Sequence, residues 1–238
     1  KLTSVQPNIW KLANLRELTL MSNPIGSISE DIGNLRHLSA LNLGNTQISR
    51  LPETIGNLTN LVNLDIGMNY LTDLPESFWN LTALLYLFMD NNRLTSLSEN
   101  IREMRVLRHL TMNYNLLTSL PESIGSLMLL RLLEVSNNGL LSLPESIGNL
   151  GNLNELYLKG NGISSLPGSV VNMANLRFLH LGDNELMSVP AGMADMENLG
   201  VVHLDFYFRD IIEDKKLLGK VTFGEEKPDT KPACCIAY

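Results

Sequence analysis

The segment LEVSNNGLLSLPESIGNLGNL, residues 133–153, is one copy of a pattern that decides the architecture of the chain. The pattern returns 23 residues later, around Leu156 and Asn161, and is present 23 residues earlier, around Leu110 and Asn115. A fixed period of this length is typical of stacked repeats, so the sequence predicts a solenoid. One position recurs at an unbroken interval of 23 and is mostly asparagine: Asn23, Thr46, Asn69, Asn92, Asn115, Asn138, Asn161, Asn184 and Tyr207.

The first half of each copy reads L-x-L-x-x-N, as in Leu179-His180-Leu181. Apolar residues two apart, with an outward residue between them, predict a short half-buried strand. Strands of successive copies should pair in parallel about 4.8 Å apart, which gives about nine strands in a sheet roughly 40 Å long. Each asparagine amide can satisfy backbone groups where the chain turns inward, which predicts an interior ladder. Thr46 can do part of this and Tyr207 cannot, so we expect the ladder to end there.

The second half reads L-P-E-S-I-G-N-L-x-x-L. Proline suits the first position of a short helical turn, and it or serine occupies that position at Ser29, Pro52, Pro75, Ser98, Pro121, Pro144, Pro167 and Pro190. A carboxylate follows in six copies and is favoured by the exposed N–H groups of a helix start, which we interpret as a solvated acidic column: Glu30, Glu53, Glu76, Glu99, Glu122 and Glu145. Later apolar residues such as Ile124 and Leu127 should close the core, which is stable only when neighbouring copies stack.

These residues resemble the leucine-rich-repeat family over residues 1 to about 212. The 23-residue L-P-x-x-I-G-x-L-x-x-L version is similar to that of the Ras-suppressor, Ras-scaffold, Scribble/Erbin and plant Ras-group repeat proteins. The resemblance implies an α/β solenoid: a right-handed horseshoe with a concave parallel sheet and short helical or 3-10 turns on the convex side. It also implies an intracellular protein that binds proteins, with small GTPases, phosphatases and kinases as partner classes.

The two ends of the chain break the pattern. Leu2, Val5 and Ile9 align with the second half of a copy, so the solenoid, residues 1–207, is expected to open in the middle of a repeat. The apolar pattern fails at Lys216. We expect a C-terminal cap over residues 208–223, in which Asp210 caps a short helix that ends at Gly219. Residues 224–238 are charged and contain proline, as is typical of a tail.

Composition and charge narrow the classes of partner. The formal net charge of −7 and the isoelectric point of about 5.1 argue against a nucleic-acid surface. There is no apolar run long enough to cross a membrane. The two cysteines, Cys234 and Cys235, are adjacent and make a poor structural disulfide, so we read the chain as one from a reducing compartment, the cytoplasm.

Outward strand positions are the candidate binding site, because they need not serve the core. They form three columns: the first precedes a buried leucine, the middle one follows it, and the third lies two residues further on. Aromatic and charged residues gather there over several copies, and exposed aromatic clusters are typical of binding anchors. The predicted partner-binding residues are Tyr86, Phe88, Asp90, His109, Asn113, Tyr114, Leu132, Glu134, Glu155, Tyr157, Lys159, Phe178, His180 and His203.

Other motifs carry less specific signals. His180 and His203 neighbour carboxylates, yet two adjacent surface histidines are more often unliganded, so no metal site and no cofactor is predicted. Asn57 and Asn80 match the glycosylation pattern inside the repeat phrase N-L-T. The last four residues begin with Cys235 and fit C-a-a-X except for Tyr238, so lipidation at Cys235 and Cys234 would place the chain on a membrane. No catalytic signature is present, so no enzyme is predicted.

The sequence thus favours a protein-interaction scaffold in intracellular signalling that binds its partner on the concave face. Two alternatives stay open. The chain could be the ligand-binding ectodomain of a receptor, or the recognition domain of a larger enzyme.

Overall fold

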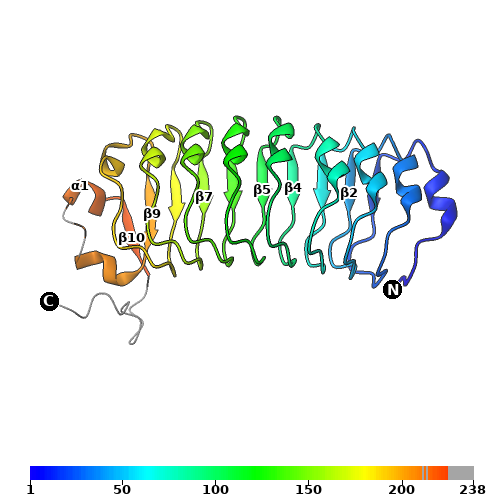
Figure 1. Ribbon diagram of the computed structural model, residues 1–238, viewed down its shortest axis with the longest axis horizontal. Coiled ribbons are helices and arrows are strands. Elements are labelled where there is room, and N and C mark those ends of the chain that lie inside the picture. The colour runs from blue at the N-terminus through cyan, green and yellow to red at the C-terminus, as the bar shows by residue number, and fades with distance from the viewer. Residues whose placement is uncertain (211, 213, 225–238) are drawn as a thin grey trace.

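The computed structural model describes residues 1–210, 212 and 214–224. Within this part of the chain, ten short strands form one parallel sheet in strict chain order (Figure 1). The strands are β1 (Glu17–Thr19), β2 (Ala40–Asn42), β3 (Asn63–Asp65), β4 (Tyr86–Phe88), β5 (His109–Thr111), β6 (Leu132–Glu134), β7 (Glu155–Tyr157), β8 (Phe178–His180), β9 (Val201–Leu204) and β10 (Val221–Phe223). The predicted solenoid is confirmed, and it has one strand more than the nine copies predict.

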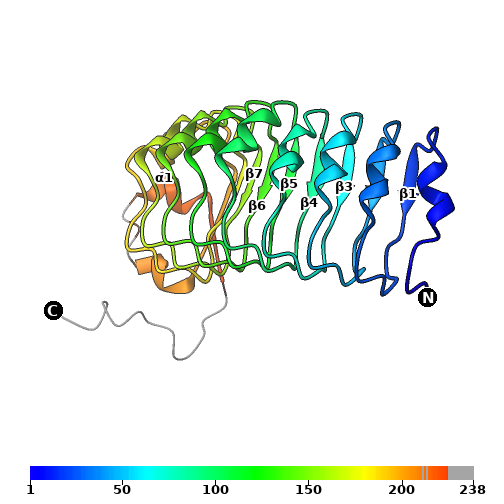
Figure 2. The same ribbon diagram turned by 45° about the vertical axis from the view of Figure 1, so that its right-hand side comes forward.

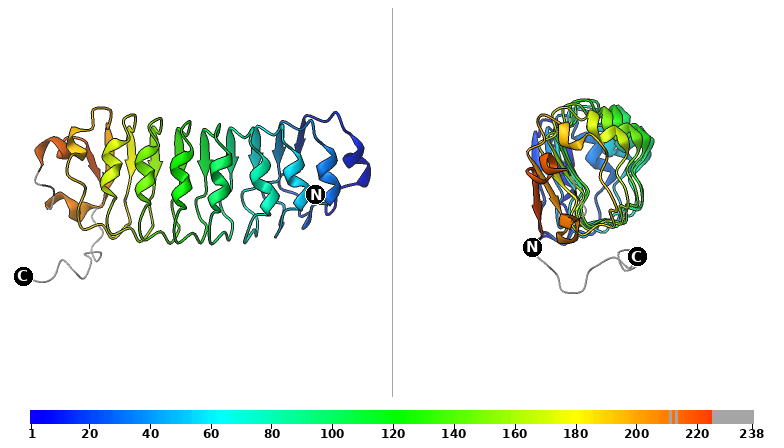
Figure 3. Two further views of the ribbon diagram at one scale, coloured as in Figure 1. Left: turned by 45° about the horizontal axis from the view of Figure 1, so that its top comes forward. Right: turned by 90° about the vertical axis from the view of Figure 1, so that its left-hand side faces the viewer.

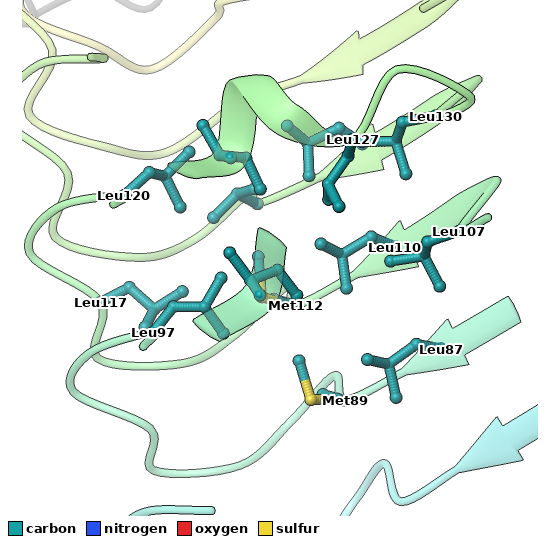
Figure 4. Close-up of a cluster of buried hydrophobic side chains, with 14 of the residues drawn as sticks. Leu87, Met89, Leu97, Leu107, Leu110, Met112, Leu117, Leu120, Leu127 and Leu130 are labelled. Atoms are coloured by element: carbon teal, nitrogen blue, oxygen red, sulfur yellow. The ribbon is translucent and has the colours of Figure 1, made fainter. Parts of the chain in front are cut away.

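Register follows the repeat. From β1 to β9 every residue pairs with the residue 23 positions later, so Leu87 lies beside Leu110 and Leu110 beside Leu133. Leu87 and Leu110, with Met89 and Met112 two residues further on, point into one continuous core (Figure 4). A unit has no second layer of its own, so its apolar side chains leave water only when the next unit stacks on them.

The interior asparagine ladder forms as predicted. Asn115 is buried; its Nδ2 donates to the carbonyl oxygens of Met89 and Met112 at 3.0 and 3.1 Å, and its Oδ1 accepts from the N–H of Leu94 at 3.1 Å. Each amide therefore joins its own turn to the unit before it. Thr46 does part of this work, donating to the carbonyl of Leu43 at 2.7 Å.

Short 3-10 segments cover the side opposite the sheet, as Figure 3 shows along the long axis. They are η1 (Pro7–Lys11), η2 (Glu30–Asn34), η3 (Glu53–Asn57), η4 (Glu76–Asn80), η5 (Glu99–Glu103), η6 (Glu122–Ser126), η7 (Glu145–Asn149), η8 (Gly168–Asn172) and η9 (Met193–Asp195). From η3 to η8 the proline or serine is extended and precedes the first helical residue, so the prediction that proline begins the turn was wrong by one position. Ser98 caps η5 by accepting the N–H of Asn100 at 3.1 Å.

The acidic column is more than a solvated face. Glu99 accepts from the N–H groups of Glu122 and Ser123 at 3.2 and 2.9 Å, and Glu122 accepts from the N–H of Ser146 at 3.3 Å. These donors begin the next 3-10 segment, where N–H groups lack partners within the helix. The carboxylate that sequence reasoning assigned to its own helix start thus caps that of the following unit, because the units stack closely.

The spacing between units depends on one convex position. At Gly56 an added Cβ would lie 2.3 Å from the carbonyl oxygen of Ser77, so glycine lets the next unit approach. Trp79 occupies the equivalent position in η4 and is buried. On the convex side, η4 and η5 stand farther apart than neighbouring pairs do (Figure 3). We attribute the wider spacing to the indole ring.

The C-terminal cap consists of η10 (Phe206–Asp210), α1 (Lys215–Leu218) and β10, which close the end of the stack (Figure 2). The helix cap is Asp214, whose Oδ1 accepts from the N–H groups of Lys216 and Leu217 at 2.8 and 3.2 Å, so the prediction that Asp210 caps this helix was wrong. Tyr207 donates its hydroxyl to the carbonyl of Asn184 at 3.1 Å, at the position where the asparagines stop. The predicted tail from residue 225 on lies outside the described residues.

Candidate functional site

The concave face is the outward side of β1–β9, and its three columns are set by strand alternation. Side chains at every second position leave the sheet on the same side, and parallel in-register pairing stacks equivalent positions of successive units. The first column contains Tyr86, His109, Leu132, Glu155 and Phe178; the middle one contains Phe88, Glu134, Tyr157, His180 and His203. The third lies just beyond the strands and contains Asp90, Asn113 and Lys159.

An aromatic group lies on β4 and β5. The rings of Tyr86 and His109 meet edge to face with centroids 4.9 Å apart. Phe88 lies two residues after Tyr86 on the same side, and Leu132 follows His109 in the first column. All four side chains are partly exposed, so they offer apolar area to a partner without belonging to the core.

A second group lies on β7–β9. Tyr157 donates its hydroxyl to Glu155 at 2.9 Å, and burial together with this carboxylate raises the pKa of Tyr157 to about 12. The ring of Tyr157 is 6.1 Å from that of His180, which is 4.4 Å from that of His203. Burial, followed by the charges of His203 and Lys159, lowers the pKa of His180. Tyr157 and His180 are therefore uncharged near neutral pH.

Polar residues of the third column are tied to the sheet. Asp90 accepts from the hydroxyl of Thr111 and, at 2.7 Å, from the N–H of Asn113. Asn113 in turn donates to Glu134 at 2.6 Å and accepts from the N–H of Ser136 at 2.7 Å. These bonds fix the ends of β5 and β6. Asp90 and Asn113 therefore have a structural role in addition to any contact with a partner.

Lys159 and Phe178, in the C-terminal half of the face, are exposed. Lys159 pairs with Asp183 at 3.3 Å in solvent, and an exposed pair of this kind contributes little to stability. The Phe178 side chain is 44% exposed although it lies in the middle of the stack.

Sequence reasoning included Tyr114 at the rim where strands end, but it missed exposed neighbours on the same rim. Tyr114 is 57% exposed, with a left-handed backbone (φ 55°); Met68, two units earlier, has the same conformation (φ 56°). Tyr70 and Leu116 are also exposed, and the Arg93 guanidinium lies 4.9 Å from the centre of the Tyr70 ring. The signal was present in the sequence, because Met68 is 46 residues before Tyr114.

The remaining predictions are placed as follows. In the described part of the chain no three histidine, cysteine or acidic side chains are grouped to hold a metal ion, His180 and His203 included. Its helices are too short and too polar for any to span a bilayer. Asn57 and Asn80 are exposed at the ends of η3 and η4. Cys234 and Cys235 lie outside the described residues.

Comparison with known proteins identifies the family. A model described as a leucine-rich repeat region matches residues 3–116 and 117–221. The chain belongs to the leucine-rich-repeat family. Members of this family are typically modules for interaction rather than catalysis, and they commonly bind proteins or other ligands. A search of curated protein sequences gives no match.

Solved structures of leucine-rich-repeat proteins from bacteria and plants are similar. A protein from Leptospira interrogans is 32% identical with a TM-score of 0.80, over 84% of this chain and 51% of that one. The plant peptide hormone receptor RGFR1, in complex with RGF2, is 28% identical with a TM-score of 0.75, over 85% of this chain and 35% of the receptor. An internalin from Listeria monocytogenes, 19% identical with a TM-score of 0.72 over 94% of this chain and 71% of that one, shares the fold. The chain thus spans about half the length of the first protein and about a third of the second.

Proposed function

We propose that this chain is a protein-interaction scaffold that binds a partner protein across β4–β9 of its concave face. The observation that carries the proposal is the run of partly exposed aromatic, histidine and leucine side chains on strands whose interior is already complete. None of these side chains is needed to fill the core. Aromatic residues are enriched among the residues that dominate binding energy at protein interfaces.

The finer proposal is a role in intracellular signalling, with a small GTPase, a phosphatase or a kinase as the class of partner. Support comes from the resemblance of the 23-residue repeat to the Ras-suppressor and Ras-scaffold proteins and from repeats that lack cysteine. Lipidation of Cys235 or Cys234 would bring this scaffold to a membrane.

A receptor ectodomain that binds a peptide is the second candidate. It is favoured by the similarity to RGFR1, whose structure is a complex with RGF2. Asn57 and Asn80 distinguish the two candidates, because both are exposed and both match the glycosylation pattern. The intact mass of the protein from its natural source separates the two: glycan at either position supports the ectodomain, and an unmodified mass supports the intracellular scaffold.

Three single substitutions test the concave face. With a partner identified by pull-down and mass spectrometry, Tyr86→Ala, Phe88→Ala and Tyr157→Ala should each raise the Kd about tenfold or more, because each removes an aromatic anchor. The melting temperature should change little, since these side chains lie outside the core. Thr19→Ala, on the outward side of β1, is the matched control. Equal affinity of all three variants and the wild type would contradict the proposal.

A further inference from the structure

A second surface lies at the edge where the strands begin, outside the concave face. Define a unit by its 3-10 segment and the strand that follows, so that unit 5 contains η5 and β5. The turn between them reads x-N-L after a leucine or methionine in five of nine units, with asparagine at Asn14, Asn60, Asn152, Asn175 and Asn198. Comparing this turn between units shows which residues the fold accepts at each of its positions.

Asparagine in this turn has a structural task. The Nδ2 of Asn152 donates to the carbonyl of Met128 at 2.7 Å, and those of Asn60, Asn175 and Asn198 bond the preceding unit in the same way at 2.8, 2.6 and 2.8 Å. The amide thus joins adjacent turns along the edge. Units 5 and 6 lack it, because Val106 and Leu129 occupy the position.

In unit 6 the residues at these turn positions are large and apolar, and their exposure to water is unfavourable. Met128 is 56% and Leu129 44% exposed, whereas the equivalent pair in unit 7 is Gly151 and Asn152. Exposed apolar side chains at positions where the fold accepts glycine and asparagine are not required by the solenoid. Adjacent exposed apolar side chains of this kind mark interaction sites.

Three arginines lie near the two apolar residues in the chain or in the stack. Arg108 and Arg131 are neighbours in the stack, because the Arg131 N–H donates to the Arg108 carbonyl at 2.8 Å; Arg105 stands one unit before Met128. In the described part of the chain, none of these three arginines has an ion pair. Glu103, two residues before Arg105, pairs with Arg102 at 3.4 Å.

Leu107 and Leu130 lie one above the other just before β5 and β6 and point into the core (Figure 4). The residues on either side of each leucine are therefore stacked as well. Leu129 and Arg131 are exposed, and Val106 and Arg108 are half-buried. The patch, defined as Arg105, Arg108, Met128, Leu129 and Arg131, carries three positive charges on a protein whose formal net charge is −7.

We propose that this patch is a docking site for an acidic segment of a protein partner that carries one or two large apolar side chains. Carboxylates of the segment would pair with the three arginines, which bind planar anions in a forked geometry. An apolar side chain of the segment would cover Met128 and Leu129. The site is additional to the concave face, and the proposal stands whether or not a partner binds there.

A display library of random 12-residue peptides, selected on the whole chain, tests the proposal. The counter-selection uses Met128→Gly/Leu129→Asn, which copies unit 7 and leaves folding intact because the new amide can donate to the Arg105 carbonyl. We expect enriched peptides that combine Asp or Glu with Leu, Ile or Phe. By fluorescence anisotropy their Kd should rise at least tenfold in this variant and in Arg105→Thr/Arg131→Asn, and should also rise with salt.

The matched control is Arg177→Asn, which changes the same position in unit 8, where Ala174 and Asn175 replace the apolar pair; its affinity should equal that of the wild type. A library without enriched acidic peptides would overturn the proposal. So would affinity that falls equally in Arg177→Asn, or affinity that survives both patch variants and is lost in Tyr86→Ala. Binding to vesicles with 30% phosphatidylserine that depends on the same residues would assign the patch to lipid instead.

Discussion

The sheet has two halves that share one interior and differ on the outside. On β1–β3 the outward residues are small or polar, and the outward side chains of β4–β8 include tyrosine, phenylalanine, histidine and leucine. Beneath both halves the same leucine core continues, and so does the ladder of interior polar side chains, with Thr46 in place of one asparagine. The fold therefore tolerates either kind of outward face. The aromatic side chains of β4–β8 are not needed for stability, which is consistent with a role in binding.

Disrupting the shared interior should have the largest effect. Asn115→Leu keeps the branched shape of the side chain but leaves the N–H of Leu94 without its acceptor. It also removes one of two donors from the carbonyls of Met89 and Met112, which keep the amides of Asn92 and Asn138. A buried group without a partner costs about 1–3 kcal/mol and each lost hydrogen bond about 0.5–1.5 kcal/mol, so we expect a loss of about 3 kcal/mol in the free energy of unfolding. Urea denaturation measures this loss of stability. The control Asn152→Ala removes one exposed hydrogen bond and should cost less than about 1 kcal/mol. Equal losses in both variants would contradict the claim that the interior asparagines stabilise the fold more than exposed ones do.

The aromatic half should contain a residue that costs stability. Tyr114 has a left-handed backbone at a position where other units have Asn45, Asn91, Asn137 or Gly160. Asparagine adopts this conformation more readily than a bulky side chain, so Tyr114→Asn should stabilise the fold by about 0.5–1 kcal/mol. Thermal and urea unfolding check the sign. A destabilised variant would mean that the exposed ring packs usefully, and the same variant should weaken partner binding if the rim belongs to the site.

The smallest effect concerns pH. Burial lowers the folded-state pKa of His180, so as the pH falls the unfolded chain takes up the proton first. The stabilising contribution is complete above the unfolded pKa of about 6.5 and is lost as the pH falls through the folded-state value. Stability should therefore decline from pH 7.5 to pH 5, and less so in His180→Asn. His37→Asn, at an exposed turn on the N-terminal side, is the control; identical pH slopes in His180→Asn and the wild type would contradict the expectation.

Sequence reasoning reached the concave face because strand alternation assigns an outward side to each residue. It placed Tyr86, Tyr157 and His180 on that side, and their ring contacts with neighbours follow from the 23-residue register. Sequence reasoning missed contacts between neighbouring units outside the strands. The carboxylate of Glu99 reaches the next helix start, which depends on how closely the units stack.

The sequence alone determined the parts of this protein that repeat. A residue such as Leu110 meets the same neighbours as its equivalents 23 positions away, so a period in the chain is also a period in space. The tertiary structure decided the features that occur only once in the chain and have no equivalent in other units. β10 forms because β9 offers an unpaired edge, Asp214 caps α1 where that helix happens to begin, and the patch around Leu129 exists because two adjacent turns depart from the pattern together. Such features depend on contacts between side chains distant in sequence, which periodicity does not encode.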